Sequence, residues 1–332
     1  MKRANNLYQH LCNLDNIMLA YKTVKKNTKN KLKIQNFEDY LSINLSNLYT
    51  SLINKTYIPG KYNIFLIKSP KQRIIMSQQI MDKIVNQLVF THILSILDKY
   101  FIDTNVATRK NKGTSYGINK TYHYLTKFPF KFYILKFDIT KYFYNIDHNI
   151  VKELLLSKIK DQDSLNLLFL MIDSTDKSYV NTKITSLNGY LYKKGKGISI
   201  GNVVCQTIGI LYLNELDHYI KEQLHIKYYI RYMDDGILFH ESKEYLQYCL
   251  KEITKIVLKY KLELNSKTMI ISSNCGFNFL GYHFYITDKV HYQVINKNRH
   301  RIAKKLKKLK LLNYEVYSKS LISYRGYLKN FK

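Results

Sequence analysis

The chain has 332 residues, enough to bury a sizeable core in one large domain or in two to three small ones. Its 53 lysines and arginines outnumber 24 acidic residues, and the net charge of +29 favours a polyanionic partner, nucleic acid first and an anionic membrane surface second. The four cysteines lie far apart and form no C-x-x-C pair, which argues against a zinc site and fits a reducing compartment.

Helices are expected over about the first 60 residues, where they would pack or present a basic arm. Apolar residues at helical spacing predict one helix from Leu14 and a second over 37–52. The N-terminus leads into no apolar stretch of a secretory signal, and apolar runs such as 167–172 are too short to cross a membrane. We therefore expect a cytoplasmic protein without membrane contact.

Two short strands are expected over 62–76, joined by a Pro-Lys-Gln-Arg turn. Lys71 and Arg73 would project from this hairpin, where fixed cations suit a triphosphate or a nucleic-acid backbone. An ordinary solvated turn is the alternative. After a long helix over 79–100, a polar and basic loop around Arg109 is suited to holding phosphates.

A nearly continuous apolar run, 132–138, predicts a strand that is buried on both faces and ends in a carboxylate, Asp138. Because an unpaired buried carboxylate is costly, Asp138 should face a cation or a cleft. A turn after the strand would bring the ring of Phe143 back beside it. Capping of a helix over 149–158 accounts for Asp147 without any chemistry.

The densest glycine cluster, 195–202, precedes a helix expected over about 203–224. Glycines before a helix let a ligand approach the backbone closely, and a plain loop is the alternative. The spacing does not match a dinucleotide-binding fingerprint.

Residues 230–239 place two acidic residues between two apolar, β-branched and aromatic runs. This pattern predicts strand, tight turn and strand, with Asp234 and Asp235 at the tip. A hairpin without any function is the alternative, because Asp-Gly by itself favours a turn. An amphipathic helix over 243–260 and a hairpin over 277–284 are expected to follow.

The last forty or so residues form a basic module. Cations alternate with Ile302, Leu306 and Leu309 at helical spacing, so they share one face of a helix. That face fits a nucleic-acid backbone, and a membrane surface is the alternative. The cations that we expect at the nucleic acid are Arg301, Lys304, Lys305 and Lys308.

Three carboxylates converge if the two predicted strands are neighbours: Asp138, Asp234 and Asp235. Hard oxygen ligands of this kind suit Mg²⁺, which keeps several waters and shares substrate phosphates. Two such ions about 3.5–4 Å apart clamp the attacking and leaving oxygens of a phosphoryl displacement. The set therefore predicts nucleotidyl transfer with two Mg²⁺ ions, and Ile139, beside Asp138, is included in the expected metal site.

Seven motifs in register then carry a family resemblance. Tyr232-Met233-Asp234-Asp235 has the form of a Y-x-D-D box, and 137–143 has the form of a first catalytic motif. Further stretches resemble two fingers motifs, two motifs after the active site and the end of a thumb: 71–75, 109–114, 264–267, 279–282 and 323–329. From about residue 14 onward the chain resembles reverse transcriptases of the group II intron and retron-like bacterial lineage.

The resemblance implies an α+β fold, a right-hand polymerase with helical and β fingers, a palm of antiparallel sheet backed by helices, and a helical thumb. The expected divisions are an N-terminal helical extension (1–60), fingers (61–130), palm (131–288) and a basic helical thumb (289–332). The implied activity is RNA-directed DNA synthesis, in which a primer 3′-hydroxyl attacks the α-phosphate of a dNTP and pyrophosphate leaves.

The same resemblance assigns roles to individual residues. Asp138 and Asp234 are the main metal ligands, and Asp235 assists less directly. Phe143 occupies the steric-gate position, where an aromatic ring excludes a 2′-hydroxyl and so selects dNTPs. Lys267 matches a lysine proposed as general acid towards pyrophosphate. The other dNTP-binding positions are Lys71, Arg73, Arg109, Gly201, Asn202 and Gln206, and those at the nucleic acid are Tyr232, Met233, Gly281 and the basic C-terminal helix.

Within the family, 200–206 is similar to the [I/V/L]-G-x-x-x-S-Q form of diversity-generating retroelements, except that Cys205 replaces the serine. Those enzymes copy a template-repeat RNA with errors at adenines and work with a small basic accessory protein. The expected partners are an RNA template, an RNA/DNA duplex, dNTPs, and such a protein or a structured non-coding RNA. Antiphage defence enzymes, retron enzymes and an inactive RNA-binding scaffold are the alternatives, whereas Phe143 disfavours an RNA-dependent RNA polymerase.

Overall fold

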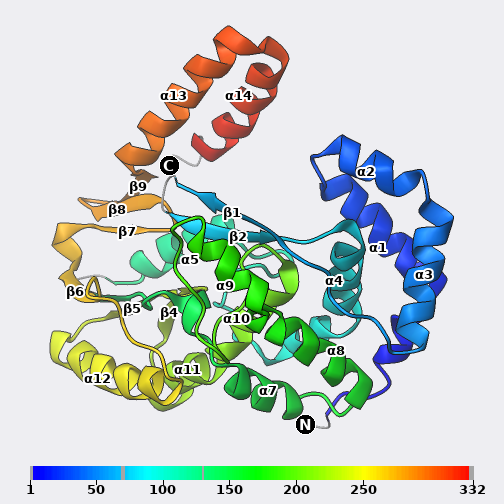
Figure 1. Ribbon diagram of the computed structural model, residues 1–332. Coiled ribbons are helices and arrows are strands. Elements are labelled where there is room, and N and C mark those ends of the chain that lie inside the picture. Colours follow the sequence, from blue (N-terminus) through cyan, green and yellow to red (C-terminus); the bar gives the residue numbers. More distant parts are fainter. Residues whose placement is uncertain (1–2, 69–71, 129–130, 329–332) are drawn as a thin grey trace. The chain divides into compact units, whose positions relative to one another are not determined.

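The computed structural model describes residues 3–68, 72–128 and 131–328, which form two compact units (Figure 1). Each unit is assembled from three separate stretches of the chain. The first comprises Met1–Ile102, Ile139–His218 and Lys255–Glu263, and the second comprises Asp103–Asp138, Tyr219–Thr254 and Leu264–Lys332. The boundaries expected for fingers, palm and thumb stay a prediction.

The first unit begins with helices, as predicted, although they are shorter than the sequence pattern suggested. They are α1 (Leu14–Asn27), α2 (Lys31–Glu38) and α3 (Leu41–Ile53). Asn13 caps α1 by accepting a hydrogen bond from the backbone N–H of Asn16. The helix expected over 37–52 forms as α3, but it begins at Leu41, because the backbone of Tyr40 leaves the helical region between α2 and α3.

The core helix of the first unit is α4 (Ile80–His92), followed by a 3₁₀ helix (Leu94–Tyr100). Among the residues described, this stretch is the one that is long and apolar enough to cross a membrane. However, 56% of its most apolar window is buried inside the protein, and α4 packs against α1 and α10 (Val203–Tyr212). The stretch is therefore packed as an interior helix of this unit.

A two-stranded hairpin and a group of short helices complete the first unit. Strands β1 (Asn63–Ile67) and β2 (Arg73–Ser77) pair antiparallel, as predicted, and α9 (Ser178–Thr185) packs against β1. The remaining helices are α6 (Tyr142–Asn145), α7 (His148–Leu156), α8 (Gln162–Ile172) and α11 (Asn214–His218). The continuous helix expected over 203–224 is interrupted, since Leu213 separates α10 from α11 with a non-helical backbone.

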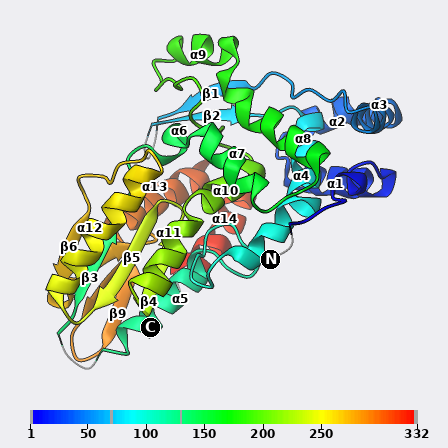
Figure 2. The same ribbon diagram turned by 90° about the horizontal axis from the view of Figure 1, so that it is seen from below.

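A four-stranded antiparallel sheet forms the centre of the second unit (Figure 2). Its strands lie in the order β4 (Tyr228–Tyr232), β5 (Asp235–His240), β3 (Tyr133–Phe137) and β6 (Met269–Ser272). The interior positions of β4 and β5 are buried, as the apolar runs predict. The sequence analysis did not predict β6.

A second, three-stranded antiparallel sheet consists of β7 (Phe277–Phe279), β8 (Tyr282–Ile286) and β9 (Val290–Val294). Helix α5 (Thr114–Leu125) packs against both β4 and β9, so it joins the two sheets in one apolar core. Helices α12 (Lys243–Lys259), α13 (Asn296–Leu312) and α14 (Tyr314–Leu328) follow their strands, and α13 packs against α14. The α+β class with antiparallel sheets is confirmed.

Candidate active site

The predicted carboxylates meet at one end of the four-stranded sheet. Asp138 follows directly after β3, and Asp234 lies in the turn between β4 and β5. Phe137 is paired with Gly236 and Tyr232 with Asp235, so the end of β3 lies beside that turn. The side chains of Asp138 and Asp234 are hydrogen-bonded to each other. Register alone therefore brings these carboxyl groups together.

The negative charges around Asp234 make its carboxyl group a weaker acid. Its pKa is raised from 3.8 to about 6, first by burial and then by the negative charges of Asp138 and Asp235. Lys136 compensates in part, since its Nζ lies 3.6 Å from Oδ1 of Asp235. The facing carboxylate oxygens of Asp138 and Asp234 are donors of the kind that a hard divalent cation such as Mg²⁺ prefers, so this pair fits such an ion.

The turn that carries Asp234 is held by a buried cation. Met233 adopts a left-handed backbone conformation (φ 57°), and its carbonyl accepts a 2.6 Å hydrogen bond from Nη1 of Arg231. Arg231 is fully buried, and its backbone is hydrogen-bonded to the segment on either side of Asn105. We conclude that Arg231 positions the turn. The sequence analysis missed this role, although a charged residue inside an otherwise apolar strand is the feature that could have revealed it.

Gly236 allows the two strands to come close at the site. A Cβ atom at this position would lie 2.3 Å from Cζ of Phe137, far inside van der Waals contact. Any larger residue would force either the buried ring of Phe137 or β5 itself to move. The glycine after the two acidic residues thus has a packing reason of its own, in addition to its preference for turns.

Two further contacts tie Asp138 and Asp235 to neighbouring segments. The backbone N–H of Asn265 donates a 2.7 Å hydrogen bond to the carbonyl of Asp138. Lys136, whose Nζ faces Asp235, also donates a 2.9 Å hydrogen bond to the carbonyl of Asn278 in β7. Lys136 is a second residue whose role the sequence analysis missed. Lys267 is exposed in the loop after Asn265.

The predicted phosphate-binding cations fall in different parts of the chain, with Arg73 in the first unit and Arg109 in the second. Arg109 bends back on its own loop, where Nη1 donates a 3.0 Å hydrogen bond to the carbonyl of Asn105. Arg73 is exposed on β2 of the first unit, and Lys71 lies outside the described residues. Their role at a triphosphate stays a prediction.

The glycine cluster of the first unit lies against β2. The backbone N–H of Met76 donates a 3.1 Å hydrogen bond to the carbonyl of Ile200, and Gly201 has φ +132°, a conformation that favours glycine. Asn202 caps α10, because its Oδ1 accepts from the N–H of Cys205 at 2.8 Å while its Nδ2 donates to Ser199. Its amide therefore orders the loop.

Three other residues predicted for this region are Phe143 in α6, Gln206 in α10 and Ile139, which lies between β3 and α6. Gln206 and Phe143 are half-buried, and Ile139, which follows Asp138, is buried. The ring of Phe143 fits over Gly209 of α10, where a Cβ atom would lie only 3.2 Å from its Cε1. Glycine at this position makes room for the ring.

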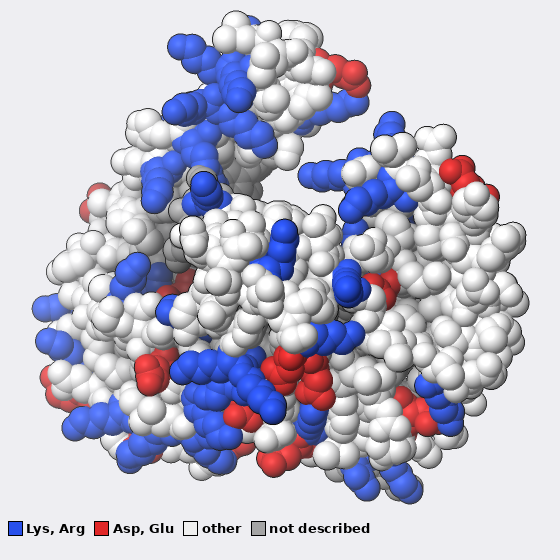
Figure 3. All heavy atoms as spheres, viewed as in Figure 1, with Lys and Arg blue, Asp and Glu red and all other residues white. Residues whose placement is uncertain are grey.

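The predicted nucleic-acid contacts divide between the turn and the C-terminal helices. Tyr232 is half-buried and Met233 is buried in the turn. Gly281 joins β7 to β8 with φ +87°, and a Cβ atom there would lie 3.0 Å from the hydroxyl of Tyr327. Lysines and arginines gather along α13 (Figure 3). All four predicted cations of that helix are exposed: Arg301, Lys304, Lys305 and Lys308.

A separate group of possible metal ligands lies in the first unit, where His148, Asp173 and Asp176 offer ligand atoms within 4.8 Å of one another. His148 Nε2 donates to the carbonyl of Gly197 at 2.7 Å, and its Nδ1 lies 3.1 Å from Asp173. Lys152 also pairs with Asp173 at 2.7 Å. This group is therefore an ion network that anchors the glycine loop. Asp147 caps α7, as predicted.

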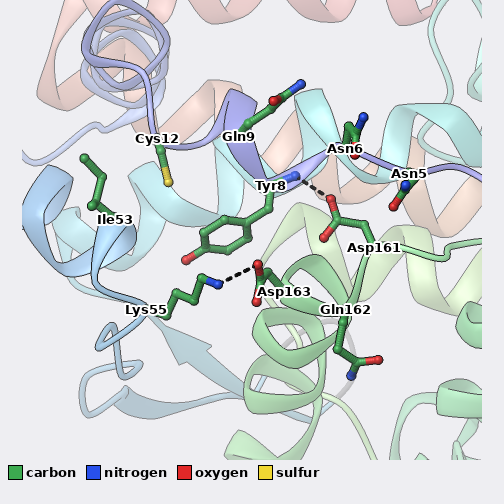
Figure 4. A pocket seen from close by; sticks show the side chains of 10 residues that line it. All are labelled: Asn5, Asn6, Tyr8, Gln9, Cys12, Ile53, Lys55, Asp161, Gln162 and Asp163. Carbon is green, nitrogen blue, oxygen red and sulfur yellow. Dashed lines mark hydrogen bonds and ion pairs between the residues drawn. The ribbon is translucent and has the colours of Figure 1, made fainter.

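A hollow of about 510 Å³ lies under the N-terminal segment, between Tyr8 and the start of α8 (Figure 4). Lys55 and Asp163 form an ion pair of 2.8 Å on its wall, and Asp161 accepts hydrogen bonds from the backbone of Leu7 and Tyr8. None of the predicted site residues lines it.

Comparison with known proteins places this geometry in a family. A comparison with curated proteins gave no match. A solved structure of apo telomerase from Candida tropicalis, truncated from its C-terminal domain, is 16% identical with a TM-score of 0.49, over 68% of this chain and 53% of that one. The chain thus spans about half the length of that telomerase chain. The family model described as reverse transcriptase (RNA-dependent DNA polymerase) matches residues 61–284, two thirds of the chain and all of the carboxylate site. The chain therefore belongs to the reverse transcriptase family.

Proposed function

We propose that this protein is an RNA-directed DNA polymerase that extends a primer 3′-hydroxyl with dNTPs. The observation that carries the proposal is the half-buried pair of Asp138 and Asp234, hydrogen-bonded and with the pKa of Asp234 raised to about 6. A structural ion pair would neutralise such charges, whereas here carboxylates face one another. That arrangement suits residues that must bind cations during the reaction.

In the proposed mechanism, Asp138 and Asp234 would hold two Mg²⁺ ions, and Asp235 would assist. When bound, the ions would supply the charge that stabilises the attacking and leaving oxygens of the displacement. Arg231 keeps the turn rigid through the carbonyl of Met233, so that the carboxylates need little rearrangement when substrate binds. Lys136 keeps Asp235 turned towards β7.

Substrate selection is assigned to the first unit in this proposal. Phe143 would exclude the 2′-hydroxyl of an incoming nucleotide, and its support by Gly209 holds the ring in place. Arg73 and Arg109 are the cations proposed to neutralise the triphosphate, as the family resemblance implies. Lys267 is the proposed proton donor to pyrophosphate, because it is an exposed cation in the loop bonded to Asp138.

Within the family we propose a diversity-generating retroelement enzyme, which copies a template-repeat RNA with errors at adenines. The supporting feature is the segment 200–206, whose Cys205 stands where that group has serine. Cys205 is buried, and its Sγ lies 3.3 Å from Oγ of Ser199, a position that a serine hydroxyl could also occupy. An antiphage defence or retron-type enzyme is the alternative.

The test is primer extension on a defined RNA template with Mg²⁺ and dNTPs, followed by sequencing of the product. Errors concentrated opposite template adenines support the diversity-generating assignment. Accurate or untemplated DNA supports the defence or retron alternative. Folded protein that makes no product with any primer and template tried would contradict the proposed polymerase and favour a scaffold that only binds RNA.

A further inference from the structure

The ion network of His148, Asp173 and Asp176 brings three metal-ligand atoms together within the first unit. His148 is the first residue of α7, and Asp173 and Asp176 are the first and last residues of the 3₁₀ helix that follows α8. One imidazole nitrogen and one oxygen of each carboxylate lie within 4.8 Å of one another. None of these three residues belongs to the carboxylate pair of the candidate active site.

The hydrogen bonds of His148 determine what its Nδ1 atom can bind. The side chain is 2% exposed, and its Nε2 must carry a hydrogen, because the carbonyl of Gly197 at 2.7 Å can only accept. In a neutral imidazole, Nδ1 then holds a lone pair. That lone pair faces Oδ1 of Asp173 at 3.1 Å and Oδ2 of Asp176 at 3.6 Å, which are acceptors as well. A proton or a metal ion is needed between these three atoms.

A metal ion accounts for the positions of both carboxylates, whereas a proton accounts for one. A proton on Nδ1 can bond Oδ1 of Asp173, but Oδ2 of Asp176 at 3.6 Å is beyond hydrogen-bonding distance. Two ligands of one ion, each about 2.0–2.2 Å from it, lie roughly 2.8–3.6 Å apart at octahedral to tetrahedral angles. Both distances from Nδ1 fall in that range.

Each of the three ligand groups is also held by a partner outside the cluster. Nε2 of His148 donates to Gly197, as described above. Nζ of Lys152 donates a 2.7 Å hydrogen bond to Oδ2 of Asp173, which leaves Oδ1 towards the imidazole. The backbone N–H of Gly195 lies 3.1 Å from both oxygens of Asp176 and donates to them. Outer partners of this kind fix the tautomer and the orientation of metal ligands.

Charge and donor type favour a divalent transition-metal ion at this place. The two carboxylates outnumber the single ammonium group of Lys152, so negative charge is in excess when the imidazole is neutral. Imidazole nitrogen is a common ligand of Zn²⁺, whereas Mg²⁺ prefers oxygen ligands alone. The side chains of Asp173 and Asp176 are 43% and 26% exposed, so an ion can enter from solvent and complete its shell with water.

We propose that Nδ1 of His148 and the carboxylates of Asp173 and Asp176 bind one Zn²⁺ ion, with water as the remaining ligand. The ion would join the start of α7 to the 3₁₀ helix. Because Gly195 and Gly197 are hydrogen-bonded to the ligands themselves, it would also order the glycine loop that leads to α10. The inference does not depend on the polymerase activity proposed above.

Calorimetric titration of the protein with Zn²⁺ in excess Mg²⁺ tests the proposal, because Mg²⁺ competes at sites that are made of oxygen alone. The wild type should bind one Zn²⁺ per chain, and Asp234→Asn should bind it equally well. His148→Ala should weaken this binding by at least about 10-fold, since it removes a direct ligand. Asp176→Asn, which keeps an acceptor for Gly195 but loses the charge, should also weaken it. Urea unfolding should show that Zn²⁺ stabilises the wild type more than either variant.

The matched control is His300→Ala, which removes an exposed histidine from α13 and should leave Zn²⁺ binding unchanged. Asp176→Asn alters a partly exposed side chain and keeps the test valid even if His148→Ala fails to fold. A wild type that binds no Zn²⁺ in excess Mg²⁺, or unchanged binding in folded His148→Ala or Asp176→Asn, would overturn the proposal and leave a protonated His148 in the network. A protein without polymerase activity that binds Zn²⁺ as described leaves the inference standing.

Discussion

Neutralising Asp234 should stabilise the metal-free protein while abolishing its activity. The pKa of this carboxyl is raised from 3.8 to about 6. Its charged form is therefore destabilised at neutral pH, first by burial and then by the negative charges of Asp138 and Asp235. A shift of roughly two units corresponds to about 3 kcal/mol, because each unit is worth ~1.4 kcal/mol. Asp234→Asn removes that charge, and we expect the free energy of unfolding in EDTA at pH 8 to rise by up to about 3 kcal/mol.

The stability gained by Asp234→Asn should depend on pH in a defined direction. Between 3.8 and about 6 the folded protein binds more protons at Asp234 than the unfolded chain does. Stability contributed by this group is therefore present at low pH and is lost as the pH rises through that window. At a pH of about 4.5 the wild type has regained about 2 kcal/mol, so the advantage of Asp234→Asn should shrink to ~1 kcal/mol.

Urea unfolding of both proteins in EDTA, at the two pH values, measures these differences. Asp288→Asn, a change of an exposed acid in the β8–β9 turn, is the matched control and should alter stability by less than about 0.5 kcal/mol. Mg²⁺ should then stabilise the wild type but not Asp234→Asn. The reasoning fails if Asp234→Asn is no more stable than the wild type at pH 8, or if its advantage is the same at both pH values.

Three further substitutions test how the site is held together. Arg231→Met removes the buried hydrogen bond to the Met233 carbonyl and should lower the free energy of unfolding in urea by roughly 1.5–3 kcal/mol. It should also reduce kcat more than primer–template affinity, and an unchanged kcat would contradict a positioning role. Gly236→Ala forces a Cβ against Phe137 and should lower the free energy of unfolding by about 1–3 kcal/mol in the same melt. It should also lower activity, and full activity would show that the close approach is not needed. Phe143→Ala should let rNTPs be incorporated in a competition assay, and unchanged sugar selectivity would remove its gate role.

The carboxylate site was predictable because its residues lie on local patterns. The runs before Asp138 and around Asp234 read as buried strands, and both strands form with the acidic residues at their ends. The hairpins over 62–76 and 277–284 follow the same local logic. In each of these segments, alternation and turn residues carry the information within a few positions.

The supporting residues could not be predicted in the same way. The role of Arg231 depends on the segment around Asn105, and that of Lys136 depends on β7, more than a hundred residues away in each case. Helix ends were also missed, because the breaks at Tyr40 and Leu213 are not marked by proline or glycine. Strand β6 was missed since its partner, β3, lies more than a hundred residues earlier in the chain.

Incorporation of a single dNTP into a labelled primer on an RNA template bears most directly on the central claim. The wild type, Asp138→Asn and the control Asp288→Asn should be compared at saturating Mg²⁺, with primer–template binding measured in parallel. The account predicts that Asp138→Asn retains binding but loses incorporation, because the carboxyl group of Asp138 is hydrogen-bonded to that of Asp234, whereas Asp288→Asn retains both. Incorporation at the wild-type rate by Asp138→Asn would contradict it.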